Sequence, residues 1–441
     1  MKKMSTKNLI IYSLILFSCP VFSQKILNPE EAFSMALEYN YGIKITNNSL
    51  EIAENNTSIL NSGYLPTLTG NAGATFNLDN TEAQFSNGQS TVLNGAESSR
   101  YNASVNLNYV VFDGMGRQYN FKRLKEEFYL SQLEARETIE NVIIQLFTIY
   151  YELAKTYENS LALEQTLTIS KDRLLRAEYQ FEYGQNTKLG VLNAQVDINN
   201  DSINLININQ QLKNTKRDLN VVIGNQIKEN FNVKTDLKFL LDLDKDELLT
   251  KTKANNVALL QAERNISIGE IDIKSRKSQY LPTIGLIGSY GWNKNNNNAA
   301  SFATTTLNTG LSGGINFAWD LFDGGSTITQ VKNSKIILDN QKLQKEQLII
   351  NIERDFYNAW EDYQNKLVIF NVQEDNIITS QNNFERTQEK FKLGQATSIE
   401  FRQAQLNLRN AELSRNQAKY DAKLAELFVL QISGDLLNVE F

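Results

Sequence analysis

Few residues in this chain have side chains suited to catalysis. The sequence contains no histidine, and its single cysteine is Cys19, close to the N-terminus. Imidazole bases, thiol nucleophiles and cysteine–histidine metal sites are therefore excluded from the rest of the chain. Chemistry that uses only carboxylates, or a serine with a lysine, would still be possible, but no motif supports it. We therefore predict that the protein is not an enzyme and needs no cofactor or metal.

Asp113 and Asp323 are the acids with the most regular placement, since both lie in an FDG motif. Two carboxylates brought together could form an acid pair. An Asp-Gly step directly after a strand is, however, typical of a turn followed by a helix cap. We therefore interpret Asp113-Gly114 and Asp323-Gly324 as turns that connect a strand to a helix.

Residues 1–23 are interpreted as a secretory signal peptide. Three lysines give this segment a basic start, and its apolar run over 9–17 is too short to cross a bilayer. Cleavage before Gln24 is favoured, and cleavage before a lipidated Cys19 remains open. Loss of the three lysines changes the net charge from −6 to −9, and no basic cluster follows, so we expect no nucleic-acid partner.

The chain contains two copies of one unit. The tetrapeptide YLPT occurs at 64–67 and 280–283, and FEYGQNT at 181–187 matches FKLGQAT at 391–397. These pairs and the FDG motifs occur in the same order at nearly the same offset, which is the signature of a repeat. We predict a signal peptide over 1–23, a first repeat over 24–224, a linker over 225–244, a second repeat over 245–434 and a tail over 435–441.

Each repeat is predicted to open with a helix and then to switch to strands. In the first repeat the helix should begin at Pro29 and continue to about Ser62. Pro66 and Pro282, the prolines of the two YLPT motifs, mark the change. Proline has no amide proton to donate, and it restricts the residue before it to extended conformations.

Alternating apolar and polar residues follow each proline. Leu68, Ala72 and Phe76 share one face of the first run, and four such runs of about 10 to 12 residues occur in the chain. This length and period suit tilted membrane-spanning strands, although a half-buried sheet of a soluble protein would show the same alternation. The polar segments 79–99 and 293–308 are predicted to be external loops.

Two long helical hairpins are the strongest signal in the sequence. No glycine or proline occurs over 117–183 or over 326–393, and apolar residues there recur at intervals of three and four. A continuous helix of this size would be about 100 Å long and would carry a coiled-coil seam. Each should end at a left-handed glycine, Gly184 or Gly394, after which a threonine caps a return helix.

The second return helix shows two adjacent apolar seams, so it can pack against a neighbour on each side and help to close a ring around a lumen. The seam of smaller residues contains Phe401, Ala404, Leu408, Ala411, Ala418, Ala422 and Ala425. The seam of larger residues contains Ile399, Leu406, Leu413, Tyr420 and Leu427.

Four membrane strands per chain cannot close a barrel, because single-chain barrels begin at about eight strands. An open sheet edge cannot face lipid. Several chains must therefore share one barrel, and two, three or more copies would each meet this requirement.

The pattern as a whole resembles the TolC-type outer-membrane efflux channels. The resemblance rests on the duplicated order of helix, two strands, long helix and return helix, with the YLPT, FDG and F-x-x-G-Q-x-T motifs, and it covers essentially the whole mature chain. It implies an α+β membrane protein with long antiparallel coiled-coil helices (an α-barrel). It also implies that the four transmembrane β-strands of each chain contribute to a shared trimeric 12-stranded β-barrel, built by internal duplication.

The resemblance also implies where the protein lies and what it contacts. We expect a homotrimer in the bacterial outer membrane, with outer-membrane lipid around the strands and the helical part in the periplasm. We expect a periplasmic adaptor (membrane fusion) protein and an inner-membrane pump of unknown type as partners. The function would be passive conduction of substrates to the exterior, in a tripartite efflux or type I secretion system.

The same resemblance suggests roles for the hairpin tips. The tips would contact the adaptor through Gly184, Gln185, Asn186, Thr187, Gly394, Gln395, Ala396 and Thr397. Relatives carry two inward acidic residues that form a ring at the closed periplasmic aperture. Here Glu400 occupies the first of these positions and Gln403 the second, while Gly190 corresponds to Glu400 in the first repeat. The alternative for Glu400 is a solvated acid that is favoured at a helix start.

Two other functions remain open at this point. A secreted coiled-coil adhesin or scaffold would explain the helices but not the alternating strands. A stand-alone porin would explain the strands but not the long helices.

Overall fold

A computed structural model describes residues 25–228, 231–240 and 243–438. The predicted signal peptide with Cys19 and the last residues of the predicted tail lie outside these ranges. The chain divides into two compact units. The first comprises 1–45, 137–256 and 351–441, and the second comprises 46–136 and 257–350.

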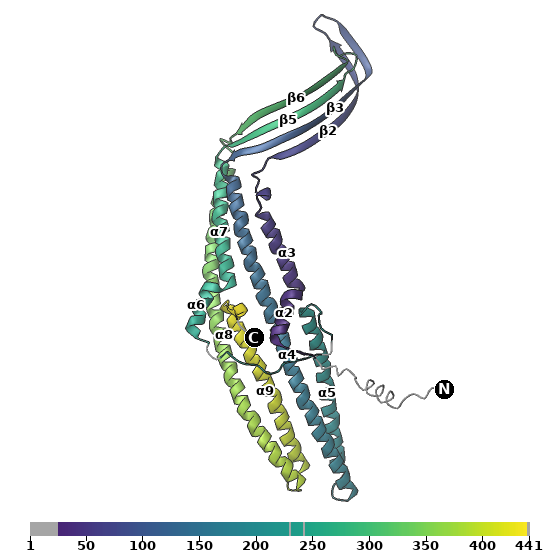
Figure 1. Cartoon of the computed structure of the whole chain (residues 1–441), viewed down its shortest axis with the longest axis vertical. Coiled ribbons are helices and arrows are strands. Elements are labelled where there is room, and N and C mark those ends of the chain that lie inside the picture. Colours follow the sequence, from purple (N-terminus) through teal and green to yellow (C-terminus); the bar gives the residue numbers. More distant parts are fainter. Residues whose placement is uncertain (1–24, 229–230, 241–242, 439–441) are drawn as a thin grey trace, which may run out of the picture. The chain divides into compact units, whose positions relative to one another are not determined.

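Four long helices form two hairpins (Figure 1): α4 (Gly116–Glu182) with α5 (Lys188–Val222), and α8 (Ser326–Lys392) with α9 (Ser398–Ile432). Both α4 and α8 contain 67 residues, so the two glycine- and proline-free segments are indeed continuous helices. Among the described residues, no helix combines the length and the apolar character that crossing a membrane would require.

Shorter elements precede each hairpin and follow the last one. They are α2 (Pro29–Tyr39), α3 (Tyr41–Asn56), α6 (Lys245–Asn255), α7 (Val257–Lys277) and the 3-10 turns η1 (Ile59–Asn61), η2 (Ser278–Tyr280) and η3 (Leu436–Asn438).

The single opening helix predicted for the first repeat is wrong. The chain breaks at Asn40, where ψ is 127°, and α3 then ends at Asn56 rather than near Ser62. The Asn40 side chain explains the break, because its Oδ1 accepts a hydrogen bond from Gly42 N at 2.8 Å and thus caps α3. Its Nδ2 also donates to the carbonyl of Val222, which anchors the break to the end of α5.

Pro66 and Pro282 lie directly before strands, as predicted. Strand β2 begins at Thr67 and β5 at Thr283. Neither proline ends a long helix, however, since a 3-10 turn intervenes in each repeat. The proline therefore sets the start of the strand, while the helix ends earlier.

The four predicted strands form one antiparallel sheet in the order β2-β3-β5-β6, which leaves β2 and β6 at its edges. The strands are β2 (Thr67–Gln84), β3 (Ser90–Asp113), β5 (Thr283–Asn296) and β6 (Thr305–Ala318). The register aligns apolar residues with one another on one face and polar residues on the other. Leu68 pairs with Leu107, and Leu286 pairs with Ile315.

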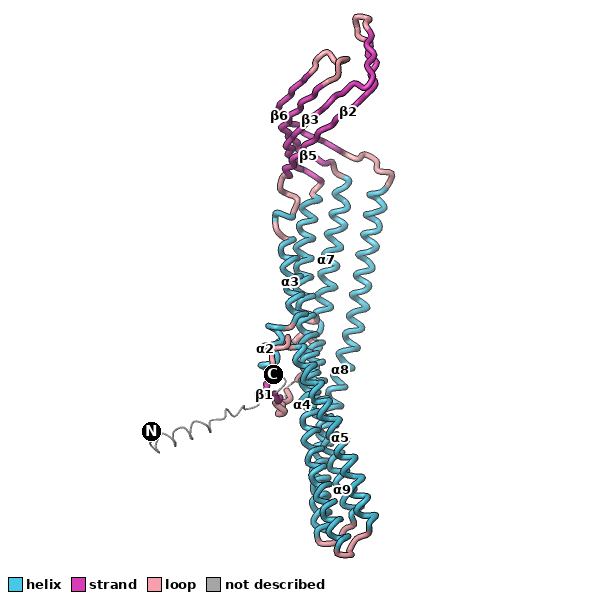
Figure 2. Tube along the Cα trace, turned by 90° about the vertical axis from the view of Figure 1, so that its right-hand side faces the viewer, coloured by secondary structure: helices cyan, strands magenta, loops and turns pink. Residues whose placement is uncertain are grey.

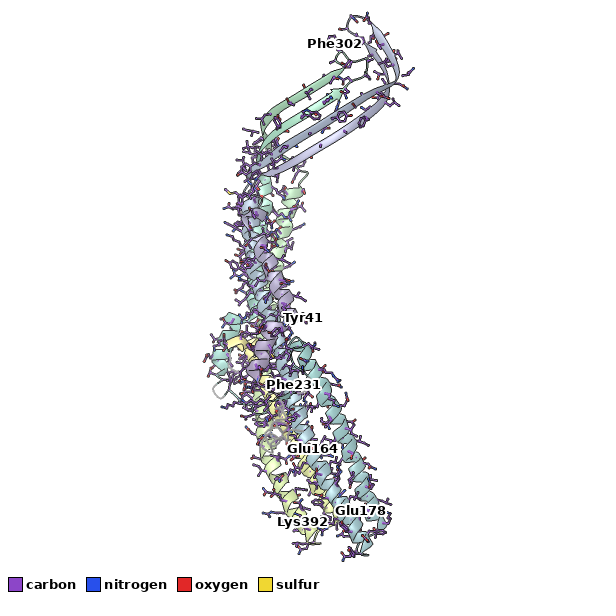
Figure 3. All side chains as sticks on the ribbon, turned by 45° about the vertical axis from the view of Figure 1, so that its right-hand side comes forward. Tyr41, Glu164, Glu178, Phe231, Phe302 and Lys392 are labelled. Carbon is purple, nitrogen blue, oxygen red and sulfur yellow. The ribbon has the colours of Figure 1, made fainter. Side chains whose placement is uncertain are left out.

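The segment predicted as a long loop over 79–99 is largely strand. After an irregularity near Asp79, the ladder between β2 and β3 continues to the pair Gln84 and Ser90. In Figure 2 these two strands extend as a ribbon beyond the ends of β5 and β6. The second loop, predicted over 293–308, is also shorter than predicted, because β5 continues to Asn296 and β6 begins at Thr305. Figure 3 shows Phe302 exposed in this loop.

The Asp-Gly turns are confirmed. Asp113 Oδ2 accepts a hydrogen bond from Arg117 N at 2.9 Å, and Asp323 Oδ2 accepts one from Thr327 N at 2.7 Å. Both aspartates therefore cap the first turn of a long helix. Hydrogen bonds from Thr327 hold the pKa of Asp323 below its usual range. Gly114 and Gly324 adopt φ values of 66° and 70°, which a side chain would oppose.

The main core of the first unit surrounds a small parallel pairing that the sequence did not indicate. Strand β1 (Lys25–Leu27) pairs with β4 (Phe231–Val233), which lies inside the predicted linker. The fully buried Tyr150 of α4 donates from its hydroxyl to Leu27 O at 2.8 Å and accepts from Lys234 N at 3.2 Å. Burial raises the pKa of Tyr150, so this hydroxyl keeps its proton.

We predict that the apolar face of the sheet contacts lipid. Leu107→Arg should destabilise the assembled protein by about 2–4 kcal/mol, because an arginine near the bilayer midplane is poorly solvated. Asn108→Arg, one residue along β3 on the polar face, should be tolerated. The yield of assembled protein in the membrane is the measurement. Equal yields of the two variants would refute the assignment of faces.

Candidate functional site: the tips of the helical hairpins

Both hairpins end in the same turn. Gly184 and Gly394 adopt φ values of 70° and 76°. The next amide reaches back to the helix end, with Gln185 N donating to Gln180 O at 2.7 Å and Gln395 N to Lys390 O at 2.8 Å. This pattern satisfies carbonyls at a helix C-terminus and requires a left-handed residue, which confirms the predicted role of the glycines.

The return helices are capped as predicted. Thr187 Oγ1 accepts from Gly190 N at 3.3 Å, and Thr397 Oγ1 accepts from Glu400 N at 3.2 Å. The remaining tip positions match one another as well. Asn186 and Ala396 are half-buried, whereas the other tip residues named above are exposed. Figure 3 shows Lys392 and Glu178 near the ends of the two hairpins.

Glu400 takes part in this cap. Its Oε2 accepts hydrogen bonds from Thr397 N at 2.7 Å and from Thr397 Oγ1 at 2.8 Å, which completes a capping box. These bonds hold the pKa of Glu400 below its usual range, so the carboxylate is ionised at neutral pH. Gln403, one turn later, is exposed and donates from Nε2 to Asn407 Oδ1 at 2.8 Å.

Gly190, the counterpart of Glu400 in the first repeat, has a different role. A Cβ at this position would lie 2.4 Å from Oδ1 of Asn186. The same Asn186 oxygen accepts from Thr187 N at 2.8 Å. The absence of a side chain at Gly190 therefore makes room for a side chain that stabilises the turn.

Near the tips, the two hairpins are joined by a buried ionic cluster. Asp201 of α5 is only 1% exposed and accepts from Arg402 Nη1 at 2.7 Å and Nη2 at 2.9 Å. It also accepts from Ser170 Oγ of α4 at 2.6 Å. A two-point contact between guanidinium and carboxylate is strong and fixes the orientation of both groups. Arg402 thus holds α9 against both helices of the first hairpin.

Further groups extend this cluster. Arg173 forms an ion pair with Asp197, and Arg409 Nη1 lies 3.9 Å from Asp201 Oδ1. Gln405 donates from Nε2 to Thr166 O at 2.9 Å. Burial lowers the pKa of Arg409, an effect that the neighbouring Asp201 opposes.

This cluster was not predicted from the sequence, although a signal for it is present there. Polar residues recur on α9 at intervals of three and four, which is the spacing of a buried seam. The residues are Arg402, Gln405, Arg409, Glu412, Asn416, Lys419, Lys423 and Glu426. Several of them bond to the first hairpin, as Asn416 does to Asn159 and Lys419 to Glu158. Such a polar stripe is easily mistaken for a solvated helix face.

The apolar seams of α9 behave differently from each other. The seam of smaller residues is buried along its whole length, from Phe401 to Ala425. The seam of larger residues is buried at Tyr420 and Leu427, but Ile399 at the tip is 79% exposed. The second seam therefore becomes open to solvent as α9 approaches its first turn.

A cleft of about 500 Å³ lies between the beginnings of α5 and α9. Leu189, Val196, Ile399 and Leu406 supply apolar walls, and Gln403 supplies an amide. Thr187 and Thr397, the two cap residues, lie at its rim. The cleft thus brings together both predicted tips and one predicted gate residue, with the ionic cluster at its base through Arg173, Asp197 and Arg402.

Comparison with known proteins identifies the family. The model of the family described as "Outer membrane efflux protein" matches residues 32–225 and 248–435. The chain belongs to the outer membrane efflux protein family. It is 19% identical over 432 residues to outer membrane efflux protein BepC of Brucella suis, covering 97% of this chain and 90% of that protein. It is also 19% identical to TolC of Escherichia coli over 355 residues, covering 78% of this chain and 71% of TolC.

Solved structures support the same fold. The Campylobacter jejuni CmeC outer-membrane channel matches with a TM-score of 0.76 at 16% identity, covering 92% of this chain and 86% of CmeC. The efflux protein is therefore a passive outer-membrane channel, not an enzyme, and its helical part extends into the periplasm. Channels of this family are homotrimers that work with periplasmic adaptors and inner-membrane pumps. The adhesin and stand-alone porin alternatives are rejected.

We predict that Asp201 is essential to the packing of the tip region. Asp201→Asn removes the carboxylate that meets Arg402 at two points and leaves only Asp197, whose Oδ1 lies 3.6 Å from Arg402 Nε, which should cost about 3 kcal/mol. Hydrogen exchange of the α5 and α9 amides would report the loosening. Asp172→Asn, which removes an exposed acid from α4, is the control and should change stability by less than about 0.5 kcal/mol. Similar exchange in both variants would show that the cluster contributes little.

Proposed function

We propose that the efflux channel uses the cleft between α5 and α9, together with the two turns at its rim, as the docking site for its periplasmic adaptor. The observation that carries this proposal is the exposure of matched turns beside an apolar cleft. Leu189 and Ile399, which line this cleft, are 66% and 79% exposed in the single chain. A helical hairpin of the adaptor would bury them.

The two repeats supply the two sides of this site. Thr187, the last residue of the turn over 184–187, lines one side, and Thr397, the last residue of the turn over 394–397, lines the other. The buried link between Asp201 and Arg402 holds the two sides at a fixed separation, which reduces the entropy lost on binding. The adaptor would thus meet a preformed surface built from both hairpins of a chain.

We further propose that the periplasmic gate lies at Glu400 and Gln403. Both are exposed on the first turns of α9, and in the trimer three copies of Glu400 would form an acidic ring. The capping box occupies Oε2 of Glu400, so the same carboxylate would both start the helix and line the aperture. Only one carboxylate per chain contributes, because Gln403 and Gly190 are uncharged.

The nature of the cargo depends on the pump that the adaptor recruits, which is either an efflux pump or a type I secretion pump. Disruption of the gene, followed by comparison of drug susceptibility with the secreted proteome, distinguishes these two roles. Loss of drug resistance indicates an efflux system, and loss of a secreted protein indicates a secretion system.

The adaptor site predicts a specific defect at the tip glycines. Gly394→Val should weaken binding of the cognate adaptor, because valine disfavours the left-handed conformation by about 1–2 kcal/mol and the turn would distort. Open space surrounds a Cβ at this position, so direct clashes would not contribute. Crosslinking of the channel to its adaptor is the measurement.

Gly88→Val provides a matched control, since Gly88 also has a positive φ of 85° and open surroundings but lies in the turn between β2 and β3. This variant should bind the adaptor normally. If Gly394→Val abolished the trimer itself, the glycine would serve folding rather than recognition.

The gate predicts a charge effect that can be separated from helix capping. Glu400→Gln keeps a side chain that can complete a capping box but removes the charge. A narrow ring of carboxylates focuses its field, so this variant should lose cation preference and block by a trivalent cation in single-channel recordings.

Glu178→Gln, which removes an exposed acid near the other tip, is the control and should leave the block unchanged. Should Glu400→Gln behave like the wild type while Glu400→Ala loses stability, Glu400 would act only at the helix start and the gate would lie elsewhere.

A further inference from the structure

The polar face of the sheet is a nearly uncharged wall. Five successive rows cross this face, each with one residue from every strand. They contain a single ionisable residue and one isoleucine, and every other residue is a glycine or carries a hydroxyl or amide side chain. The row through Asn106, for example, contains Thr69, Ser289 and Ser312. Ser289 Oγ donates to Asn106 Oδ1 at 2.7 Å, which shows that these side chains lie on one face.

Arg100 is the single ionisable group in these rows. It belongs to the row of Thr75, Asn295 and Thr306, at the loop end of the face. Arg100 Nε donates to Asn295 Oδ1 at 3.2 Å, and Asn295 Nδ2 donates to Thr306 Oγ1 at 3.2 Å. This chain of hydrogen bonds across three strands holds the guanidinium against the wall instead of leaving it free in solution.

The nearest acid on this face along β2 is Asp79. It lies four residues beyond Thr75, which corresponds to about 13 Å along the strand, in the ribbon that extends past the last pair shared by β3 and β5. At that distance the acid is screened from Arg100 at ordinary salt, where the Debye length is about 8–10 Å. The positive charge of Arg100 therefore dominates its own row.

The opposite face at the same level has the character of a lipid boundary. Tyr101, Trp292 and Lys294 lie there, with Phe76 packed edge-on against Tyr101 at a centroid distance of 5.6 Å. Aromatic and lysine side chains are enriched where a membrane protein meets the headgroups. In an outer-membrane trimer the apolar face therefore contacts lipid, and the polar face with Arg100 lines the lumen.

We propose that Arg100 sets the charge preference of the channel exit. In the trimer, three guanidinium groups form a ring at the loop end of a stretch of lumen that is otherwise uncharged over these five rows. A ring of one sign in a neutral wall attracts counter-ions, so the exit favours anionic over cationic solutes. The proposal does not depend on the adaptor site or the acidic gate, which belong to the hairpin tips.

The ring also suggests a class of substrate. A solute with a carboxylate or phosphate would be drawn through the exit, and a guanidinium can bind either group at two points. The asparagine, serine and threonine side chains of the wall offer neutral hydrogen bonds that would not retain it. An anionic or zwitterionic solute would thus leave more readily than a polycation.

A local measurement tests whether the charge lies in the lumen. The sequence contains one cysteine, Cys19, so the wild-type chain serves as the blank for a cysteine placed at Thr75, the register partner of Arg100. The assembled Thr75→Cys trimer is treated with an anionic and with a cationic methanethiosulfonate reagent. The ratio of the two rates reports the local potential, because the thiolate fraction affects both rates equally.

Arg100→Gln should lower the anionic-to-cationic ratio about three- to fivefold at low salt, since removing a charge from the neighbouring strand shifts the two rates in opposite directions. Lys294→Gln removes the same charge at the same level from the other face and should leave the ratio unchanged. An unchanged ratio in Arg100→Gln, or an equal change in Lys294→Gln, overturns the proposal.

Reversal potentials in a salt gradient test whether the channel uses this charge. At about 10 mM salt, where the Debye length is about 30 Å, Arg100→Glu should shift the permeability ratio toward cations by roughly twofold or more. The shift should disappear near 1 M salt. If the reagent ratio changes but the reversal potential does not, Arg100 lines the lumen without selecting ions, and its proposed role is wrong.

Discussion

The unpaired backbone groups along β2 and β6 constrain everything else in this protein. A four-stranded sheet with the order β2-β3-β5-β6 leaves one row of amides and carbonyls unsatisfied on each outer edge. Within lipid, each such group costs several kcal/mol, because no water is present to bond it. The sheet is therefore incomplete in a single chain. The homotrimer of the family supplies the missing edges, so that the lumen forms only when chains associate.

The helical hairpins show a second kind of dependence, on buried polar contacts. On α9 the seam of smaller residues provides close packing, while the polar stripe provides specific contacts to the other hairpin. Replacing such contacts by apolar residues often preserves stability. Their value here lies in orientation, since Arg402 meets Asp201 and Ser170 in only one arrangement of the hairpins. The tips thus form a defined cleft rather than two independent loops.

Local patterns in the sequence predicted the long helices, the glycine turns, the four strands and the aspartate caps, because each depends on near neighbours. Contacts between distant segments were not predicted. The pairing of β1 with β4 relies on Tyr150, which is far from both strands in the sequence. The break at Asn40 was missed because an asparagine inside a helical pattern looks like a minor defect. The ribbon over 79–99 was mistaken for a loop because polar residues in it pair with apolar ones, as Thr81 does with Leu93 and Glu82 with Val92, so no alternating apolar face marks it.

A disulfide scan between the two sheet edges tests the central constraint most directly. Within one chain Ala72 and Thr309 occupy the same row but lie three strand spacings apart, about 14 Å, which is too far for a disulfide. Ala72→Cys is combined with a cysteine at Thr309, Leu311 or Gly313 of β6, on the same face. We expect at least one pair to give covalent dimers and trimers on a denaturing gel after oxidation in the membrane. Monomers alone for every pair, together with a stably folded monomer in detergent, would contradict it.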